Sequence, residues 1–498
     1  MIDGLKPYPE YKESGQPWLG VVPNRWEVLP NRAIFEEVKE RGHPDEEMLS
    51  VTIKRGVIRQ KELLADSSKK DGSNQNKSAY KIVCPNDIAY NKMRAWQGAV
   101  GVSNFRGIVS PAYVIMRLRE INNPRYFHHL FRTPLFSKEA ERWSYGITSD
   151  MWSLRPEHFK MIYTPLPPTD EQAAIVKFLD HATRRLNRAI RAKQKVIALL
   201  NEQKQVIIHR AVTRGLDPDV SLKPSGILWL GDIPTNWATI QLARGLTKIE
   251  QGWSPVASND EDTEDRWAVI TLSAVKGGIF DPKCRKPLPR SLNPEPRFEI
   301  RQGDFLLTRA NTRTLVGDVA VVGDCRRKLM LCDLVYRIGL KKEMIFPNFL
   351  MMVLLSKIGR IQIEGDARGS SETMVKISHP HIRSWCIPLP PIEEQRSIFM
   401  GIESLIQPIH FAISCYNHEI SLLQEFRTRL IADVVTGKLD VREATRRIPG
   451  ETEPNDFSVE NGEFVNGYDT FDSPCLTERK ELDEIDSNLL EYAKGANQ

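Results

Sequence analysis

Cysteine is scarce in this chain and follows no pairing pattern. The 498 residues include seven cysteines, none of them in a Cys-x-x-Cys pair. This spacing excludes the usual disulfide frameworks and cysteine-based zinc sites, so we expect reduced thiols in a cytoplasmic protein. No uninterrupted apolar run approaches the length that spans a bilayer, and Met1–Lys6 lacks the pattern of a secretory signal. We therefore expect no contact with a membrane.

Catalytic motifs are also missing. The sequence contains no Gly-x-x-x-x-Gly-Lys-Ser/Thr phosphate loop, no Asn-Pro-Pro-aromatic or Asp-Pro-Pro-aromatic motif of an amino-methylating enzyme, and no His-Glu-x-x-His metal site. The ten histidines are dispersed, and the closest groups, His128–His129 and His379/His381, are more typical of surface or structural histidines than of metal ligands. We expect a chain that is not an enzyme and that binds no metal or cofactor itself.

Negative charge is sparse except at the C-terminal end. Residues 442–498 contain 14 Asp/Glu and 6 Lys/Arg, which leaves a net charge of +13 on residues 1–441 within the total of +5. A basic body of this size suits a polyanionic partner, although a solvated Lys/Arg surface would look the same. The acidic tail has few large apolar residues, so we expect it to be mostly disordered and can assign it no function.

What the chain does contain is an internal repeat. Three blocks occur twice in the same order, namely Trp18–Trp26 and Trp229–Trp237, Pro165–Gln172 and Pro388–Gln395, and Ala211–Asp217 and Val434–Asp440. A period above 200 residues is too long for a solenoid. It indicates a duplicated two-part unit, and two such units can pack about a pseudo-two-fold axis.

A long helix is predicted between the second and third block of each copy. Apolar residues recur there at three-, four- and seven-residue spacings, which favours a coiled-coil-like stripe. The stripes are Leu179, Leu186, Ile190, Ile197, Leu200 and Ile207, then Ile398, Ile402, Leu405, Ile409, Ile413, Ile420, Leu423 and Leu430. Thr169 and Gln172 fit a capping box. Pro408 should kink or interrupt the second helix.

These patterns predict an α/β (α+β) chain with two globular domains and two long helices. Each helix of about 43 residues would be about 65 Å long and could not bury its stripe within one globular segment. We therefore expect the helices to pair antiparallel and the globular segments to lie at opposite ends. The predicted order is a lead-in at 1–21, globular domain 22–168, helix 169–213, linker 214–231, globular domain 232–391, helix 392–437 and the acidic tail 442–498.

Basic and polar loops follow apolar strands in both globular segments. Asp87–Gly98 precedes Ser103–Gly107 in the first, and Gly303–Arg313 lies in the second. Aligning Asp87 with Asp304 places Lys92 against Arg309. Arg and Lys read guanine, Asn and Gln read adenine, and a basic run such as Lys283–Lys286 suits phosphates. The residues predicted to contact DNA are Lys92, Arg94, Gln97, Arg106, Lys283, Arg285, Lys286, Arg309, Asn311, Thr312 and Arg313.

The doubled set of motifs resembles the specificity subunits of Type I restriction–modification systems over residues ~10–440. The Pro-x-Pro-Pro-x-x-Glu-Gln helix openings carry most of the resemblance. The Leu-Gly-x-x-Pro-x-x-Trp entries, the helix ends, Gln251–Pro255 and Asp304–Thr312 add to it. The first segment lacks the Gly-x-Ser-Pro element at Gly252–Pro255, and the acidic tail matches no part of the pattern.

The resemblance implies a non-catalytic chain with two target-recognition domains, each reading one half of a split double-stranded DNA target. It implies that the helices form a spacer that docks two modification (methyltransferase) subunits, with restriction (motor and nuclease) subunits joining the complex. S-adenosylmethionine, ATP and Mg would be used by those partners. Near the junctions, the residues expected to contact a partner are Glu171, Gln172, Glu394 and Gln395. Local capping is the alternative, and it explains the two glutamates at least as well.

Two other interpretations stay open. A stand-alone restriction–methylation protein would need a nuclease or methyltransferase domain, for which the chain has no segment left. A coiled-coil scaffold that binds protein partners would carry its basic charge incidentally, and its affinity for DNA would be absent rather than salt-dependent.

Overall fold

The computed structural model describes residues 5–65, 77–146, 152–254, 263, 265–369 and 374–448. The acidic tail beyond Ile448 and the start of the lead-in lie outside the described residues. The chain divides into two compact units. The first unit comprises residues 1–188 and 423–498, and the second comprises residues 189–422. Each unit therefore contains one globular segment and part of both long helices.

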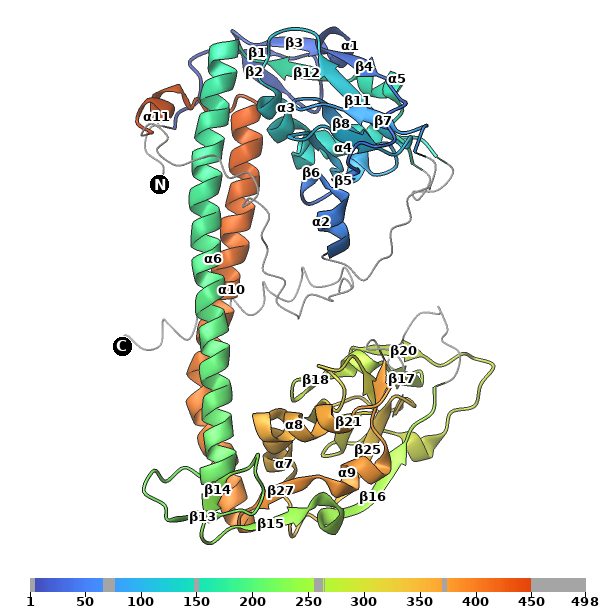
Figure 1. Cartoon of the computed structure of the whole chain (residues 1–498), viewed down its shortest axis with the longest axis vertical. Coiled ribbons are helices and arrows are strands. Elements are labelled where there is room, and N and C mark those ends of the chain that lie inside the picture. The colour runs from blue at the N-terminus through green and yellow to red at the C-terminus, as the bar shows by residue number, and fades with distance from the viewer. Residues whose placement is uncertain are drawn as a thin grey trace. The chain divides into compact units, whose positions relative to one another are not determined.

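The first unit is built on a four-stranded antiparallel sheet (Figure 1). Its order is β4 (Phe35–Val38), β11 (Tyr113–Leu118), β8 (Ile88–Asn91), β9 (Val100–Val102). Phe35, Phe127 and Phe159 are buried in its core, with Phe127 from α3 and Phe159 from α5. The helices are α1 (Asn31–Ile34), α2 (Gln60–Ala65), the 3₁₀ helix η1 (Ala95–Gln97), α3 (Pro124–Phe131), α4 (Pro134–Arg142) and α5 (Pro156–Met161).

The second unit repeats this sheet with the same strand order. Its order is β16 (Leu246–Gln251), β25 (Val335–Leu340), β21 (Phe305–Thr308), β23 (Val319–Val321), again antiparallel. A further sheet has the order β20 (Arg285–Pro287), β17 (Ala268–Ile270), β24 (Leu329–Met330). The helices are α7 (Pro347–Leu355), α8 (Lys357–Asp366) and α9 (His379–Ser384). The repeated strand order confirms the duplication read from the sequence.

Small two-stranded sheets complete both units. Equivalent pairs are β1 (Tyr11–Glu13) with β2 (Val21–Pro23) and β13 (Leu222–Pro224) with β14 (Asp232–Pro234), then β3 (Glu27–Pro30) with β12 (Tyr163–Leu166) and β15 (Ala238–Gln241) with β27 (Cys386–Leu389). Within the described ranges, pairs without such a counterpart are β5 (Leu49–Thr52) with β6 (Gly56–Arg59), β7 (Lys81–Val83) with β10 (Gly107–Val109), β18 (Val275–Lys276) with β19 (Ile279–Phe280), and β22 (Ala310–Asn311) with β26 (Val375–Lys376).

The turns before β8 and β21 are each held by an aspartate at the equivalent position. Asp87 accepts a hydrogen bond from the Cys84 N–H at 2.8 Å, and Asp304 accepts one from the Arg301 N–H at 3.0 Å. Both carboxylates also accept from an arginine on the neighbouring strand, Arg117 at 2.8 Å and Arg337 at 3.3 Å respectively. These shared contacts support aligning Asp87 with Asp304, as the sequence suggested.

The two long helices, α6 (Thr169–Arg214) and α10 (Ile392–Val435), pack antiparallel in both units. Asn187 accepts from Arg427 at 2.7 Å in the first unit. In the second unit Lys193 pairs with Glu419, and Lys204 lies 3.1 Å from His410. Residue numbers fall on α10 as they rise on α6, which fixes the antiparallel direction. The predicted stripes are buried or half-buried with one exception, Leu405, whose place in the core is taken by Ile406.

Two expectations about these helices differ from the structure. Pro408 does not interrupt α10, because it lies on an exposed face where water can satisfy the carbonyl that its missing N–H leaves unbonded. Thr169 and Gln172 form no capping box. The amide of Gln172 donates to the Pro167 carbonyl at 2.9 Å instead.

The middle of α10 is poor in charged residues. Between Arg396 and Glu419 the only Asp, Glu, Lys or Arg is Glu403. As a result α10 contains an 18-residue window with a mean hydropathy of 1.4, long and apolar enough to cross a membrane by length and composition alone. One such helix is weak evidence, since core helices of soluble proteins pass the same test.

Candidate nucleic-acid interface

Arg309 is fixed at the end of the central strand of the second unit. It follows Thr308, the last residue of β21. Its N–H donates to the Leu334 carbonyl at 2.7 Å, and its own carbonyl accepts from the Ile377 N–H at 2.9 Å. The guanidinium carbon lies 5.9 Å from the centre of the Tyr336 ring, within the range of a cation–π contact. The strand therefore presents a cation beside an aromatic face.

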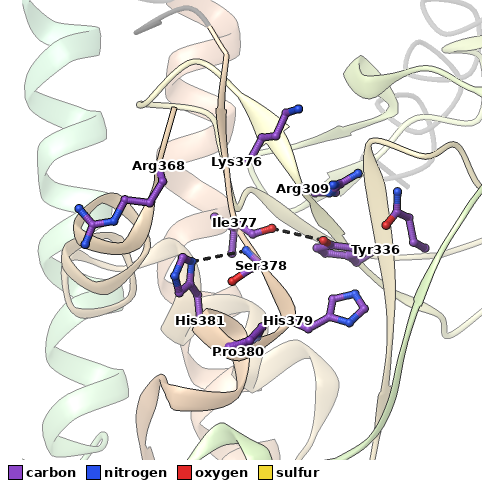
Figure 2. A pocket seen from close by; sticks show the side chains of 10 residues that line it. Arg309, Tyr336, Arg368, Lys376, Ile377, Ser378, His379, Pro380 and His381 are labelled. Carbon is purple, nitrogen blue, oxygen red and sulfur yellow. Dashed lines mark hydrogen bonds between the residues drawn. The ribbon is translucent and has the colours of Figure 1, made fainter. Parts of the chain in front are cut away.

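A pocket of about 440 Å³ opens around Arg309. Figure 2 shows Arg309 and Tyr336 on one side, with Arg368 and His381 across from them. Among the residues that the structure describes, no aspartate or glutamate lines the pocket. Its lining residues are Gln251, Arg309, Tyr336, Arg368, Lys376, Ile377, Ser378, His379, Pro380 and His381. Such a basic, partly aromatic concavity suits an anionic ligand that carries flat rings.

His379 adds a neutral polar group to this pocket. Its ring centre lies 4.7 Å from that of Tyr336 in an edge-to-face arrangement. Burial lowers the pKa of His379, and Arg383 and Arg309 lower it further, which favours the neutral imidazole. Its Nε2 is buried, with no hydrogen-bond partner in the part of the chain that the structure describes.

Gln251 reaches the pocket because a glycine follows it. A Cβ on Gly252 would lie 2.1 Å from the Leu331 carbonyl oxygen, so no other residue fits there. The close approach lets the Trp253 N–H donate to that same carbonyl at 3.1 Å. The Gln-Gly-Trp sequence thus joins the end of β16 to the loop before β25.

Lys92 occupies the position of Arg309 in the first unit. Its carbonyl accepts from the Leu154 N–H at 2.9 Å, the counterpart of the Arg309–Ile377 bond. Lys81 Nζ donates to the Tyr113 carbonyl at 2.7 Å nearby. Burial lowers the pKa of Lys81, and Lys92, Arg41 and Lys39 lower it further against the opposing effect of Glu37. Lys39, Arg41, Lys81 and Lys92 form what we call the first cation cluster.

The repeated motifs meet at one junction in each unit. In the first, the Trp26 indole N–H donates to Glu171 at 2.9 Å and a Cβ on Gly437 would lie 3.2 Å from the same indole. In the second, the Trp237 indole N–H donates to Glu394 at 2.8 Å, and a Cβ on Gly215 would lie 3.6 Å from that indole. Each tryptophan thus touches the start of one long helix and the end of the other.

The two glutamines following those glutamates are fully buried. Gln172 accepts from the Asn123 N–H and Gln395 accepts from the Phe346 N–H, both at 2.8 Å. The side chains of Glu171, Gln172 and Gln395 are buried in internal hydrogen bonds, which favours a local role for them. Their contact with a partner stays a prediction. Glu394 is half-buried and bonds Trp237 and Asn236. All four residues thus make local contacts at the junctions.

Comparisons with known proteins agree with this architecture. No family model matches the chain. It is 29% identical over 177 residues to the Type I restriction enzyme EcoEI specificity subunit of Escherichia coli, covering 35% of this chain and 30% of the relative. It is 25% identical to the MjaVIII specificity subunit of Methanocaldococcus jannaschii, covering 57% of this chain and 64% of the relative. The chain thus spans less than two thirds of either relative.

A solved chain from work on complex assembly and conformational transition of the type I R-M system shares the fold. Its TM-score is 0.57 at 14% identity, covering 83% of this chain and 98% of that chain. The chain is therefore similar to Type I restriction enzyme specificity subunits in parts of its sequence and shares its fold with the solved chain. The doubled architecture accounts for the paired motifs of the sequence.

The structure brings few of the predicted DNA-contacting residues together. Of those in the second unit, only Arg309 lines the pocket. Asn311 pairs with Val375 in a two-stranded sheet, Thr312 donates its N–H to the Asn311 side chain, and Arg313 donates to the Glu364 carbonyl at 3.3 Å. Lys283, Arg285 and Lys286 lie in or just before β20. Their contact with DNA stays a prediction.

In the first unit the predicted residues are also spread out. Arg94 and Gln97 are exposed at η1, close in sequence to Lys92. Arg106 is exposed and donates to Glu46 at 2.7 Å, and this pairing raises the pKa of Arg106. Sequence reasoning missed Lys39, Arg41, Lys81, Tyr336, Arg368 and Lys376, and it took His379 and His381 for surface or structural residues. The spacing of His379 and His381 was the available signal.

Proposed function

We propose that this chain is the non-catalytic DNA-recognition subunit of a Type I restriction–modification complex. One observation carries the proposal: equivalent strands of two duplicated units end in a cation, Lys92 or Arg309, held by the same backbone contacts. Each unit would read one half of a bipartite double-stranded target. Because the surroundings of the two cations differ, the half-sites would differ too.

The chemistry of the second pocket fits a base edge. An arginine bonds guanine O6 and N7 in a bidentate manner, and a glutamine such as Gln251 can bond adenine. Lys376 and Arg368 would contact phosphates, which position a protein without specifying sequence. In the first cation cluster Lys92 would take the reading role, and Lys39 and Arg41 the phosphate role.

Exposed apolar residues on the helices support docking of protein partners. In the second unit Phe411 is 72% exposed, Met400 66% and Val206 60%. Clustered exposed apolar side chains are typical of protein interfaces. Two modification subunits would dock there and use S-adenosylmethionine. Restriction subunits that use ATP and Mg would join through the complex, and none of these cofactors would bind this chain.

A salt series on DNA binding tests the proposal. The logarithm of the binding constant of the purified chain for duplex DNA should fall linearly with the logarithm of the salt concentration. The slope should steepen by close to one unit for each phosphate that the chain neutralises. The chain alone should neither methylate nor cut DNA, and adding a cognate modification subunit should produce adenine methylation. Methyl transfer by the chain alone would refute the proposal, and an absence of DNA affinity at low salt would favour a protein scaffold.

A further inference from the structure

One face of α6 in the first unit carries an unbroken row of basic residues. Lys177, His181, Arg184 and Arg188 follow one another at spacings of four, three and four, so they lie on one face. We call them the basic stripe. The same spacing continues in the sequence with Arg191 and Lys195, and no Asp or Glu occurs between Asp180 and Glu202.

The basic stripe lies away from the apolar face of α6. Leu179 and Ala182 are buried. They lie two residues from Lys177 and Arg184 respectively, and two residues correspond to a rotation of about 200° around the helix. Lys177, His181 and Arg184 are half-buried and Arg188 is exposed. Burial lowers the pKa of His181, and Arg185, Arg184, Arg188 and Lys177 lower it further. The stripe thus concentrates positive charge outside the helix–helix contact.

The C-terminal segment of the described chain runs onto this stripe. After α10 ends, the chain turns into α11 (Arg442–Arg446), which lies beside α6 in Figure 1. The Thr445 hydroxyl donates to the Ala174 carbonyl at 3.1 Å, and Lys177 Nζ donates to the Ile448 carbonyl at 3.3 Å. Residue numbers thus rise together along the segment and along α6. At Ile448, the last residue that the structure describes, the chain is therefore directed toward Arg188.

The sequence beyond Ile448 has the complementary charge. Residues 451–478 contain eight Asp/Glu and no Lys or Arg. From Lys177 to Arg188 the stripe is about 17 Å long, which about five extended residues can span. Glu451, Glu453 and Asp456 follow Ile448 closely enough to reach it. We propose that the acidic segment 451–478 binds the basic stripe of α6 within the same molecule.

The tether makes this association favourable. Only two residues separate Ile448 from the segment, and such a short tether gives an effective concentration in the millimolar range, so several weak ion pairs suffice. A bound acidic segment also covers cations that would otherwise attract phosphates. This consequence, unlike the contact itself, rests on the proposed DNA-binding function.

Zero-length carbodiimide cross-linking of the full chain tests the contact. An Arg184→Lys/Arg188→Lys variant keeps the charge and supplies reactive amines. We expect cross-links from carboxylates of 451–478 to residues 177, 184 and 188 in the monomer, unchanged in yield on tenfold dilution. The yield of these cross-links should fall several-fold at about 1 M salt, where the Debye length is ~3 Å. Exposed Lys138 on α4 is the internal control.

Charge reversal gives the second test. Arg184→Glu/Arg188→Glu should remove most tail cross-links to Lys177. Lys138→Glu/Arg142→Glu, which changes the net charge equally at two exposed positions of α4 in the same unit, should leave them unchanged. Equal cross-linking of the tail to Lys138 and to Lys177, or none to the stripe, would overturn the proposal.

Truncation after Ile448 separates the contact from its consequence. If the stripe also binds phosphates, the truncated chain should bind non-target duplex several-fold more tightly than the full chain at low salt, with a steeper salt slope. Cross-links to the stripe without any change in DNA affinity would keep the intramolecular contact and contradict the masking of a DNA-binding surface.

Discussion

The indole N–H of Trp237 donates a hydrogen bond to Glu394 over 2.8 Å, across 157 residues of sequence. Trp26 makes the same contact with Glu171 over 2.9 Å. These bonds explain why the tryptophan blocks and the helix openings are both repeated. Each pair is one anchor between a globular segment and the first turn of a long helix.

Trp237→Phe should weaken the anchor of the second unit. The change removes the indole donor and keeps most of the apolar volume. We expect the free energy of unfolding to fall by about 1–3 kcal/mol, because a charged acceptor loses a partner. Urea denaturation followed by circular dichroism would measure it. Trp96→Phe is the control, since the Trp96 indole donates to the Met93 carbonyl at an exposed site. Equal losses in both variants would contradict the anchor.

Gln172→Ala and Gln395→Ala should destabilise the chain without abolishing partner binding directly. Each substitution removes the acceptor of a backbone N–H, that of Asn123 or that of Phe346. We expect each to lower the free energy of unfolding by about 1–3 kcal/mol. Thermal unfolding measures this loss. The folded fraction should still co-purify with the modification subunit, and a folded variant that does not would revive a direct contact.

Arg309→Ala should weaken discrimination in one half-site and leave the other intact. A lost bidentate base contact costs about 1–3 kcal/mol. Binding to a panel of single-base variants of the target would measure it. Arg301→Ala, at an exposed cation outside the pocket, is the control. Uniform weakening across all sequences would make Arg309 a phosphate contact.

Lengthening both long helices should change the gap between half-sites. Four residues inserted after Lys193 and four opposite, after His418, add about 6 Å to each helix and nearly preserve the register of the stripe. At ~3.4 Å per base pair, the preferred spacer should grow by roughly one to two base pairs. Methylation of targets with graded spacers measures this. An unchanged optimum in a folded variant would show that the helices do not set the spacing.

Acid should loosen the segment after α10 through Asp440. Burial alone would raise the pKa of Asp440, but hydrogen bonds from the Arg442 side chain and N–H outweigh it and lower the pKa below 3.8. A lowered folded pKa contributes stability above the ordinary carboxyl pKa, and this contribution is lost as pH falls through the folded value. Hydrogen exchange of residues 441–448 should therefore accelerate below about pH 4, where Asp440→Asn should show less change.

Local pattern was enough to predict the repeat, both long helices and the strand that ends in Arg309. Helical periodicity and proline boundaries act between residues close in sequence, so α6 and α10 begin and end within two residues of the predicted ranges. The buried role of Gln172 was not predictable in the same way. Its partner, the Asn123 N–H, is 49 residues away and is brought there by the packing of α3.

The sequence by itself determined the duplicated order of globular segment and helix, because each element is encoded in its own apolar spacing. Only the tertiary structure decided which side chains share a site. Gln251, Arg309 and Lys376 come from three separate segments of the second unit and meet where strand register and loop closure place them. The same holds for Lys81 beside Lys92. Such contacts depend on long-range packing, which no local periodicity specifies.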